Sequence, residues 1–270
     1  MAQRKRLKLR EKYRRRVAGL TIIILVLSFA AIMLLTPAFN ITKIRVNGNS
    51  VLTDEKIIFS AGISEGVNIF GVSIAKATRG IEEMSYIENV KIKRRLPSTI
   101  EINVVEAVGV GYIPAENGYV VITADGRSIE TVANKSDNEK NGNIPVINGL
   151  KKVKYKIGSE IVCKDKKQLS ALKSFLKVFS ENGHIFNMKK IDITKFSEIT
   201  FKYNKDLEVY FGSDEKVEYK AEVFSSILKE LGENPSGYLD LERQTYREKE
   251  ENMAENQKKE NNLLTFKNFS

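Results

Sequence analysis

The stretch "YIENVKIKRRLPSTIEINVVE", residues 86–106, decides the fold of the first half of the chain. Apolar residues alternate with basic ones before Pro97, and apolar residues recur at every second position after it. A period of two is typical of half-buried β-strands, and proline between two such runs favours a turn. The stretch therefore predicts a hairpin with one apolar face. That face consists of Val90, Ile92, Ile100, Ile102 and Val104.

Three shorter patterns precede this hairpin and complete one domain. Residues 41–48 alternate like a strand and end at Asn47-Gly48, a turn signal. A helix is expected between Thr53 as the N-cap and Gly62 as the terminator. A second helical pattern follows over residues 71–86, although Gly80 weakens it. The predicted order over residues 39–107 is strand, helix, helix, strand, strand.

The N-terminal region combines a charged segment with a long apolar one. Residues 1–16 carry nine Lys/Arg and one acid, and residues 17–35 carry no charge. Nineteen helical residues span roughly 28 Å, close to the thickness of a bilayer's hydrocarbon core, and Pro37 would end the helix. We therefore expect a basic cytoplasmic tail over 1–16 and a transmembrane helix over 17–36.

The alternative for this region is a cleaved signal peptide. Its apolar part would be unusually long, and no small-x-small cleavage signal follows it, so an uncleaved anchor is favoured. The Lys/Arg excess lies wholly before the apolar segment, which predicts that the N-terminus stays in the cytoplasm and the rest of the chain lies outside it.

A second, larger domain is expected over residues 108–241. Asp125-Gly126 joins two strand-like runs, and Asp165 caps a helix that ends before Gly183. Further strand-like runs follow, then a helix over residues 215–231 and a short last strand. The fold class is thus α+β, with a mixed α/β second domain built on an antiparallel sheet. Residues 242–270 are too polar to fold alone and are predicted to be disordered.

Composition argues against several classes of function. The net charge is +10, but the first 16 residues supply +8 of it, so the other 254 residues do not carry a nucleic-acid footprint. The single cysteine, Cys163, makes no intramolecular disulfide, and the single histidine, His184, is interpreted as structural or solvent-facing. P-loop, GxGxxG and GxSxG patterns are absent. We expect no enzyme activity, cofactor or metal.

The order of elements and the phrase at residues 86–106 resemble the POTRA domain, most closely the version in the FtsQ/DivIB family of bacterial division proteins. Position 107, where the family often has a basic residue, is Ala107. The matching positions of the POTRA hairpin include Arg95, Pro97, Thr99 and Glu106. In the second domain, "IPVINGL", "VYFGS" and "YLDL" also resemble family phrases. The resemblance covers residues 1–241.

This resemblance implies a non-enzymatic scaffold of the divisome at the septal cell membrane. Its implied partners are FtsB/DivIC-type and FtsL-type division proteins, with a septal FtsW/FtsI-type synthase as a further candidate, besides the lipid bilayer. Since a sheet's last strand leaves backbone groups unpaired, a partner strand could add there. The candidate site is Gly237, Tyr238, Leu239, Asp240 and Leu241, with Tyr219 and Lys220 on the adjoining helix. Leu239→Pro is then expected to weaken binding.

Two other classes of protein remain open at this stage. A POTRA protein of envelope assembly or secretion should carry a β-barrel or several POTRA repeats. A membrane-anchored extracytoplasmic sensor or envelope enzyme should show a ligand pocket or a catalytic cluster.

Overall fold

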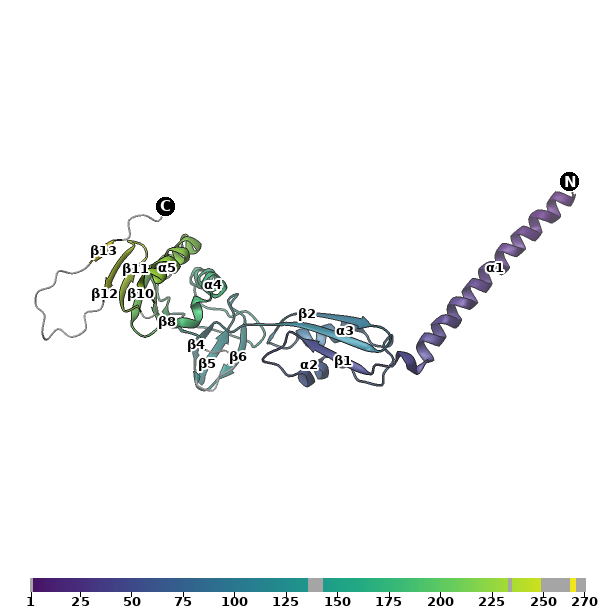
Figure 1. The fold of residues 1–270 in the computed structure, drawn as a ribbon, viewed down its shortest axis with the longest axis horizontal. Helices are drawn as coiled ribbons and strands as arrows, with labels where there is room; N and C mark the ends of the chain where they lie inside the picture. Colours follow the sequence, from purple (N-terminus) through teal and green to yellow (C-terminus); the bar gives the residue numbers. More distant parts are fainter. Residues whose placement is uncertain (1, 136–142, 233–234, 249–262, 266–270) are drawn as a thin grey trace, which may run out of the picture. The chain divides into compact units, whose positions relative to one another are not determined.

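The computed structural model describes residues 2–135, 143–232, 235–248 and 263–265 (Figure 1). The chain divides into two compact units, Met1–Glu106 and Ala107–Ser270. Each unit has its own hydrophobic core.

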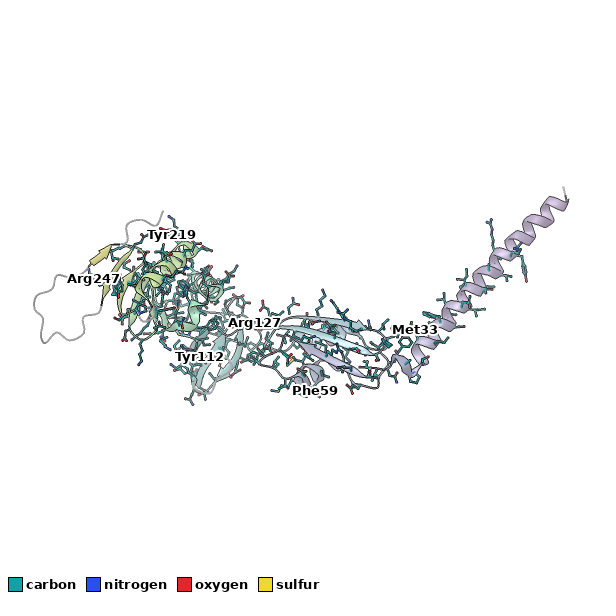
Figure 2. All side chains as sticks on the ribbon, viewed as in Figure 1. Met33, Phe59, Tyr112, Arg127, Tyr219 and Arg247 are labelled. Carbon is teal, nitrogen blue, oxygen red and sulfur yellow. The ribbon has the colours of Figure 1, made fainter. Side chains whose placement is uncertain are left out.

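One long helix, α1 (Ala2–Leu35), opens the first unit. Within the described residues it is the one helix long and apolar enough to cross a membrane, over Tyr13–Met33. The basic tail and the apolar segment are thus parts of a single helix. A short 3-10 helix, Pro37–Phe39, follows α1, near whose end Met33 lies (Figure 2). The Asn68 side chain donates a 3.0 Å hydrogen bond to the Met33 carbonyl.

The first unit confirms the predicted order of strand, helix, helix, strand, strand. Its elements are β1 (Lys43–Asn47), α2 (Asp54–Ala61), α3 (Ile74–Glu82), β2 (Ile87–Arg95) and β3 (Thr99–Glu106). The strands lie in the order β1-β3-β2, with β1 parallel and β2 antiparallel to β3. Ile100, Ile102 and Val104 are buried in one core with residues of the two helices. The hairpin's apolar face thus forms the sheet side of this core.

Close packing of two helices explains the glycine at position 80, although glycine is a weak helix former. A Cβ at this position would lie 2.1 Å from the Ser60 carbonyl oxygen on α2. Only glycine therefore allows α2 and α3 to approach so closely, which offsets the weak helix propensity of this residue.

The second unit is built on one large mixed sheet (Figure 1). Its described strands lie in the order β13-β12-β11-β10-β9-β8-β7-β4-β5-β6. In chain order these are β4 (Gly111–Ala115), β5 (Gly118–Ile122), β6 (Ser128–Val132), β7 (Val146–Asn148), β8 (Met188–Asp192), β9 (Ile199–Tyr203), β10 (Leu207–Gly212), β11 (Gly237–Asp240), β12 (Thr245–Glu248) and β13 (Leu263–Thr265). Antiparallel pairs dominate, as expected, but β4–β7, β7–β8 and β10–β11 are parallel.

Helices α4 (Lys166–Glu181) and α5 (Val217–Leu231) pack with the sheet around a phenylalanine cluster. Phe175, Phe179, Phe211 and Phe224 are all fully buried, and the Phe175 and Phe179 rings stack at 4.3 Å. Burying one such side chain is worth about 1.5–3 kcal/mol relative to leaving it exposed, so this cluster is a main source of the unit's stability.

The single histidine belongs to this core. It opens the 3-10 helix His184–Asn187, and its Nε2 lies 2.7 Å from the Ser225 hydroxyl of α5. The rings of Tyr203 and Phe224 surround it, and burial lowers the pKa of His184. The structural interpretation of His184 is therefore the correct one of the two.

Candidate partner-binding site

The strand expected at the edge of the sheet, β11, is an inner strand. It pairs in parallel with β10 on one side and antiparallel with β12 on the other. Leu239 and Leu241 are buried in the core, so Leu239→Pro would disrupt the fold and could not test binding alone. The prediction of a free β11 edge was wrong because the chain folds back after Leu241 and adds another strand.

That added strand also corrects the prediction of a disordered tail from residue 242. Tyr246 of β12 is buried, and its hydroxyl donates a 2.5 Å hydrogen bond to the Ser236 carbonyl. Strand β13 pairs antiparallel with β12 in turn. Residues 249–262 and 266–270 lie outside the described part of the chain, and disorder there stays a prediction.

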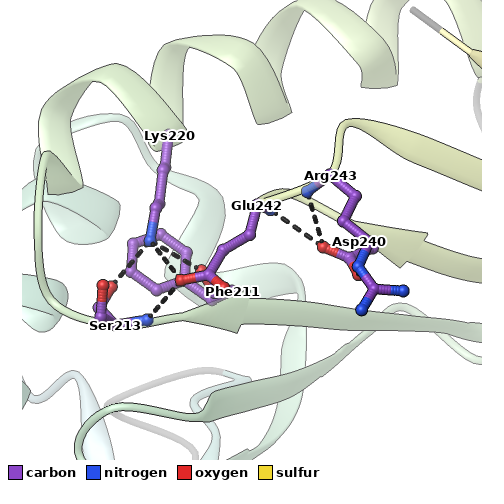
Figure 3. A network of polar contacts seen from close by, with 6 residues as sticks. All are labelled: Phe211, Ser213, Lys220, Asp240, Glu242 and Arg243. Atoms are coloured by element: carbon purple, nitrogen blue, oxygen red, sulfur yellow. Dashed lines mark hydrogen bonds and ion pairs between the residues drawn. The ribbon is translucent and has the colours of Figure 1, made fainter.

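A polar turn over residues 241–244 places β12 beside β11 (Figure 3). The buried carboxylate of Asp240 accepts hydrogen bonds from the backbone N–H groups of Glu242 at 3.0 Å and Arg243 at 2.9 Å. The Glu242 carboxylate accepts one from the Ser213 N–H at 3.1 Å, which is the main reason that its pKa is lowered. Asp240 thus shapes the turn and presents no free carboxylate to a partner.

Lys220 is the buried centre of the same network. Its ammonium donates to the Phe211 carbonyl at 3.1 Å, to the Ser213 carbonyl at 2.9 Å and to the Glu242 carboxylate at 3.4 Å. The ammonium also lies 4.9 Å from the centre of the Phe211 ring. Lys220 therefore joins α5 to the ends of β10 and β11, and it is not available to a partner (Figure 3).

Two of the predicted partner-binding residues do present their side chains. Tyr219 on α5 and Tyr238 on β11 are each 42% exposed. The Gln244 side chain donates to the Tyr219 hydroxyl at 3.2 Å, and Figure 2 shows Tyr219 together with the exposed Arg247 of β12. Gly237 contributes only backbone, pairing with Leu207 and Glu248.

Tyr238 borders a shallow cavity of about 260 Å³ over β8, β9, β10 and β11. Charged side chains surround it, among them Lys190, Asp192, Lys202 and Glu208. Partial burial, with the nearby Asp240 carboxylate as a second cause, raises the pKa of Tyr238. Tyr238 thus joins this open face of the sheet to β11, whose neighbour β12 pairs with β13 on its outer side.

The hairpin residues of the first unit have mainly structural roles. Arg95 pairs with Thr99 across the turn that contains Pro97, and its Nε donates to the Glu101 carboxylate at 2.6 Å. This hydrogen bond is the largest cause that lowers the pKa of Glu101 to about 2. The neighbouring Arg94 donates to the Ile69 and Val72 carbonyls.

Glu106 ends β3 and anchors the loop before α2. Its carboxylate accepts four hydrogen bonds of 2.8 Å, from the Ser50 N–H, the Ser50 hydroxyl, the Val51 N–H and the Leu52 N–H. Partial burial is the largest single influence and raises its pKa, but these hydrogen bonds together lower it below the ordinary value. Sequence reasoning placed Glu106 in the hairpin and missed this anchoring role.

Together these features define a membrane-anchored protein with one POTRA domain followed by a β domain. The FtsQ-type POTRA domain family matches residues 39–107, and the C-terminal domain family of cell division protein FtsQ/DivIB matches residues 111–242. The chain belongs to the FtsQ/DivIB family of bacterial cell division proteins.

Relatives in several bacteria support this assignment. The chain is 30% identical over 207 residues to cell division protein DivIB of Clostridium acetobutylicum, covering 76% of this chain and 80% of that one. It is 29% identical over 235 residues to DivIB of Clostridium botulinum strain Hall, covering 86% and 90%. Cell division protein FtsQ of Corynebacterium glutamicum is 24% identical over 216 residues, covering 78% and 89%.

Proposed function

We propose that this chain is a non-enzymatic scaffold of the divisome that binds FtsB/DivIC-type and FtsL-type division proteins outside the cytoplasm and supports septum formation. The septal FtsW/FtsI-type synthase is a further candidate partner. The observation that carries the proposal is the C-terminal side of the sheet, where β11 and β12 lie next to each other and Tyr219, Tyr238 and Arg247 are exposed.

Strand addition is the physical mechanism of this proposal. A partner segment in extended conformation gains backbone hydrogen bonds along β12, and nearby side chains select its sequence. In the described part of the chain, β12's outer neighbour is the short β13, of three residues. A partner strand would displace β13 and extend the sheet in its place.

The charge of the N-terminal region supports the topology of the proposal. Nine Lys/Arg in residues 1–16 favour a cytoplasmic N-terminus, with both domains on the opposite side of the membrane. A fluorescent fusion of the full chain is expected to form a band at mid-cell before septation. A uniform membrane signal throughout the cell cycle would contradict a divisome role.

The edge site is tested with chains that stop at different residues. A chain that stops after Glu248 keeps β12 and loses β13, so it should bind the extracytoplasmic part of an FtsB/DivIC-type partner at least as tightly as the full chain. The affinity for the partner should rise because β13 no longer competes for β12. The rise equals the inverse of the fraction of unchanged chains in which β13 has left β12. A chain that stops after Gln244 lacks β12 and should lose binding. Isothermal titration of the two chains measures the difference, and equal affinities would refute the edge assignment.

Tyr238 offers a matched pair of point variants for the same assay. Tyr238→Ala removes an exposed ring on the proposed surface, and Phe59→Ala removes an exposed ring on α2 of the POTRA domain, at 42% and 87% exposure. Weaker partner binding is expected for the first variant only. Since both rings lie outside the core, circular dichroism should show the same folded content in each.

A further inference from the structure

The β domain carries one strongly basic segment. Residues 150–173 contain eight lysines and two acids, whereas the remainder of the chain beyond residue 16 has more acidic than basic residues. The segment comprises an irregular hairpin over residues 151–164, which we call the lysine hairpin, and the first turns of α4. Its charge therefore stands out against its surroundings.

Backbone hydrogen bonds hold the lysine hairpin in one conformation. Lys154 and Val162 exchange two hydrogen bonds of 2.7 and 2.8 Å, and the Lys164 N–H donates to the Lys151 carbonyl at 3.0 Å. The buried hydroxyl of Ser128 lies 2.8 Å from the Lys156 carbonyl. The lysines are therefore displayed on a fixed scaffold, which lowers the entropy lost when a ligand binds.

Both acids of this segment are already engaged. Glu160 forms a 2.8 Å ion pair with Lys173, and Asp165 caps α4 by accepting from the Lys167 and Gln168 N–H groups. Seven lysines have no ion pair within the described residues. They are Lys151, Lys152, Lys154, Lys156, Lys164, Lys166 and Lys167, and all are exposed. Their positive charge is available to an external anion.

Apolar side chains lie among these lysines. Val162 is 58% exposed, and Tyr155 and Ile157 are 43% and 40% exposed. Between the lysine hairpin and α4 lies a recess of about 340 Å³, lined by Ile161, Val162, Cys163 and Leu169, with Lys166 and the ion-paired Glu160 and Lys173 also at its wall. This volume is at the lower end of the range for small-molecule pockets, so it suits one or two side chains of a larger ligand.

We propose that the lysine hairpin and the start of α4 bind an acidic amphipathic segment of a partner protein, which places apolar side chains in the recess and carboxylates among the lysines. A polyphosphate would leave the exposed Val162 and the recess unused. A bilayer surface is flat and would not enter a recess. This surface is separate from the β12 edge, so it adds a second contact to the proposed scaffold.

The test uses the full chain in neutral phosphatidylcholine nanodiscs and a fluorescent synthetic helix with glutamates on one face and leucines on the other. Four lysines of the hairpin are replaced by glutamine in one variant: Lys151, Lys154, Lys156 and Lys164. Four exposed lysines elsewhere in the β domain are replaced in the control variant: Lys189, Lys205, Lys216 and Lys229. Fluorescence anisotropy gives the affinities, and Val162→Ser tests the apolar part.

The hairpin variant is expected to bind the probe about tenfold more weakly than the control variant, and Val162→Ser about fivefold more weakly than the unchanged chain. Raising the ionic strength from about 0.1 M to about 1 M should weaken binding, since the Debye length falls from about 10 Å to about 3 Å. Equal affinities of the two lysine variants would overturn the proposal.

Tighter binding of polyphosphate, or binding of phosphatidylglycerol vesicles with no binding of the peptide, would also overturn it, in favour of another polyanion or of lipid. Binding of the FtsB/DivIC-type partner at the β12 edge should be unchanged in the hairpin variant. Probe binding therefore tests the lysine hairpin, and binding of the FtsB/DivIC-type partner tests the β12 edge, so the two proposals can fail independently.

Discussion

Replacing Lys220 with alanine is expected to lower the free energy of unfolding of the β domain by about 3 kcal/mol. The substitution leaves the Phe211 and Ser213 carbonyls and the Glu242 carboxylate without their ammonium donor. It also removes an aliphatic stem that is largely buried. Because the chain has no tryptophan, urea unfolding of residues 37–270 is best followed by far-UV circular dichroism, with one transition fitted for each domain.

Two variants separate the causes of this effect. Lys229→Ala changes an exposed lysine on the same helix and should shift the unfolding midpoint little. Lys220→Met keeps most of the aliphatic stem and removes the charge. Its unfolding midpoint should therefore lie between those of Lys220→Ala and Lys229→Ala. If Lys220→Ala were as stable as Lys229→Ala, Lys220 would not be the centre of a stabilising network.

The second large effect is expected at Glu106 in the POTRA domain. Glu106→Ala removes the acceptor of four hydrogen bonds and should destabilise this domain by about 2 kcal/mol, since hydrogen bonds to charged groups are the stronger ones. Glu88→Ala, at an exposed position of β2, is the matched control and should have little effect. Urea unfolding of residues 37–270 measures both.

The same carboxylate predicts a pH dependence. Its pKa is lower in the folded chain than the ordinary value of 4.5, so its stabilising contribution is complete above about pH 4.5 and is lost as the pH falls through the folded pKa. The stability difference between the unchanged chain and Glu106→Gln should therefore shrink on acidification below about pH 4.5. A constant difference down to pH 3 would show that the Glu106 carboxylate is not the titrating group.

Local patterns were enough to predict much of this fold. The alternation on both sides of Pro97 gave the β2–β3 hairpin, and Asp165 and Gly183 marked the ends of α4. Each signal depends on residues close together in the sequence, where periodicity and capping decide the structure. The Asp125-Gly126 turn between β5 and β6 was found in the same way.

The candidate site was harder to predict because it depends on distant contacts. Strand β12 reads "TYRE" in a charged region, and only its pairing with β11 and the burial of Tyr246 make it a strand. The parallel β10–β11 pair follows from the α5 crossover between them. The burial of Lys220 has no signature in the sequence, because its partners are backbone carbonyls on another element.

The strand order of the β domain has a consequence for folding during translocation across the membrane. From β8 to β12 the strands lie side by side in the order in which they are translated. In the proposed topology the sheet can therefore grow outward as the chain crosses the membrane, and the edge proposed for partner binding is complete only when residues 245–248 have crossed. A chain interrupted before residue 245 would keep its anchor and most of its core but would have no docking edge.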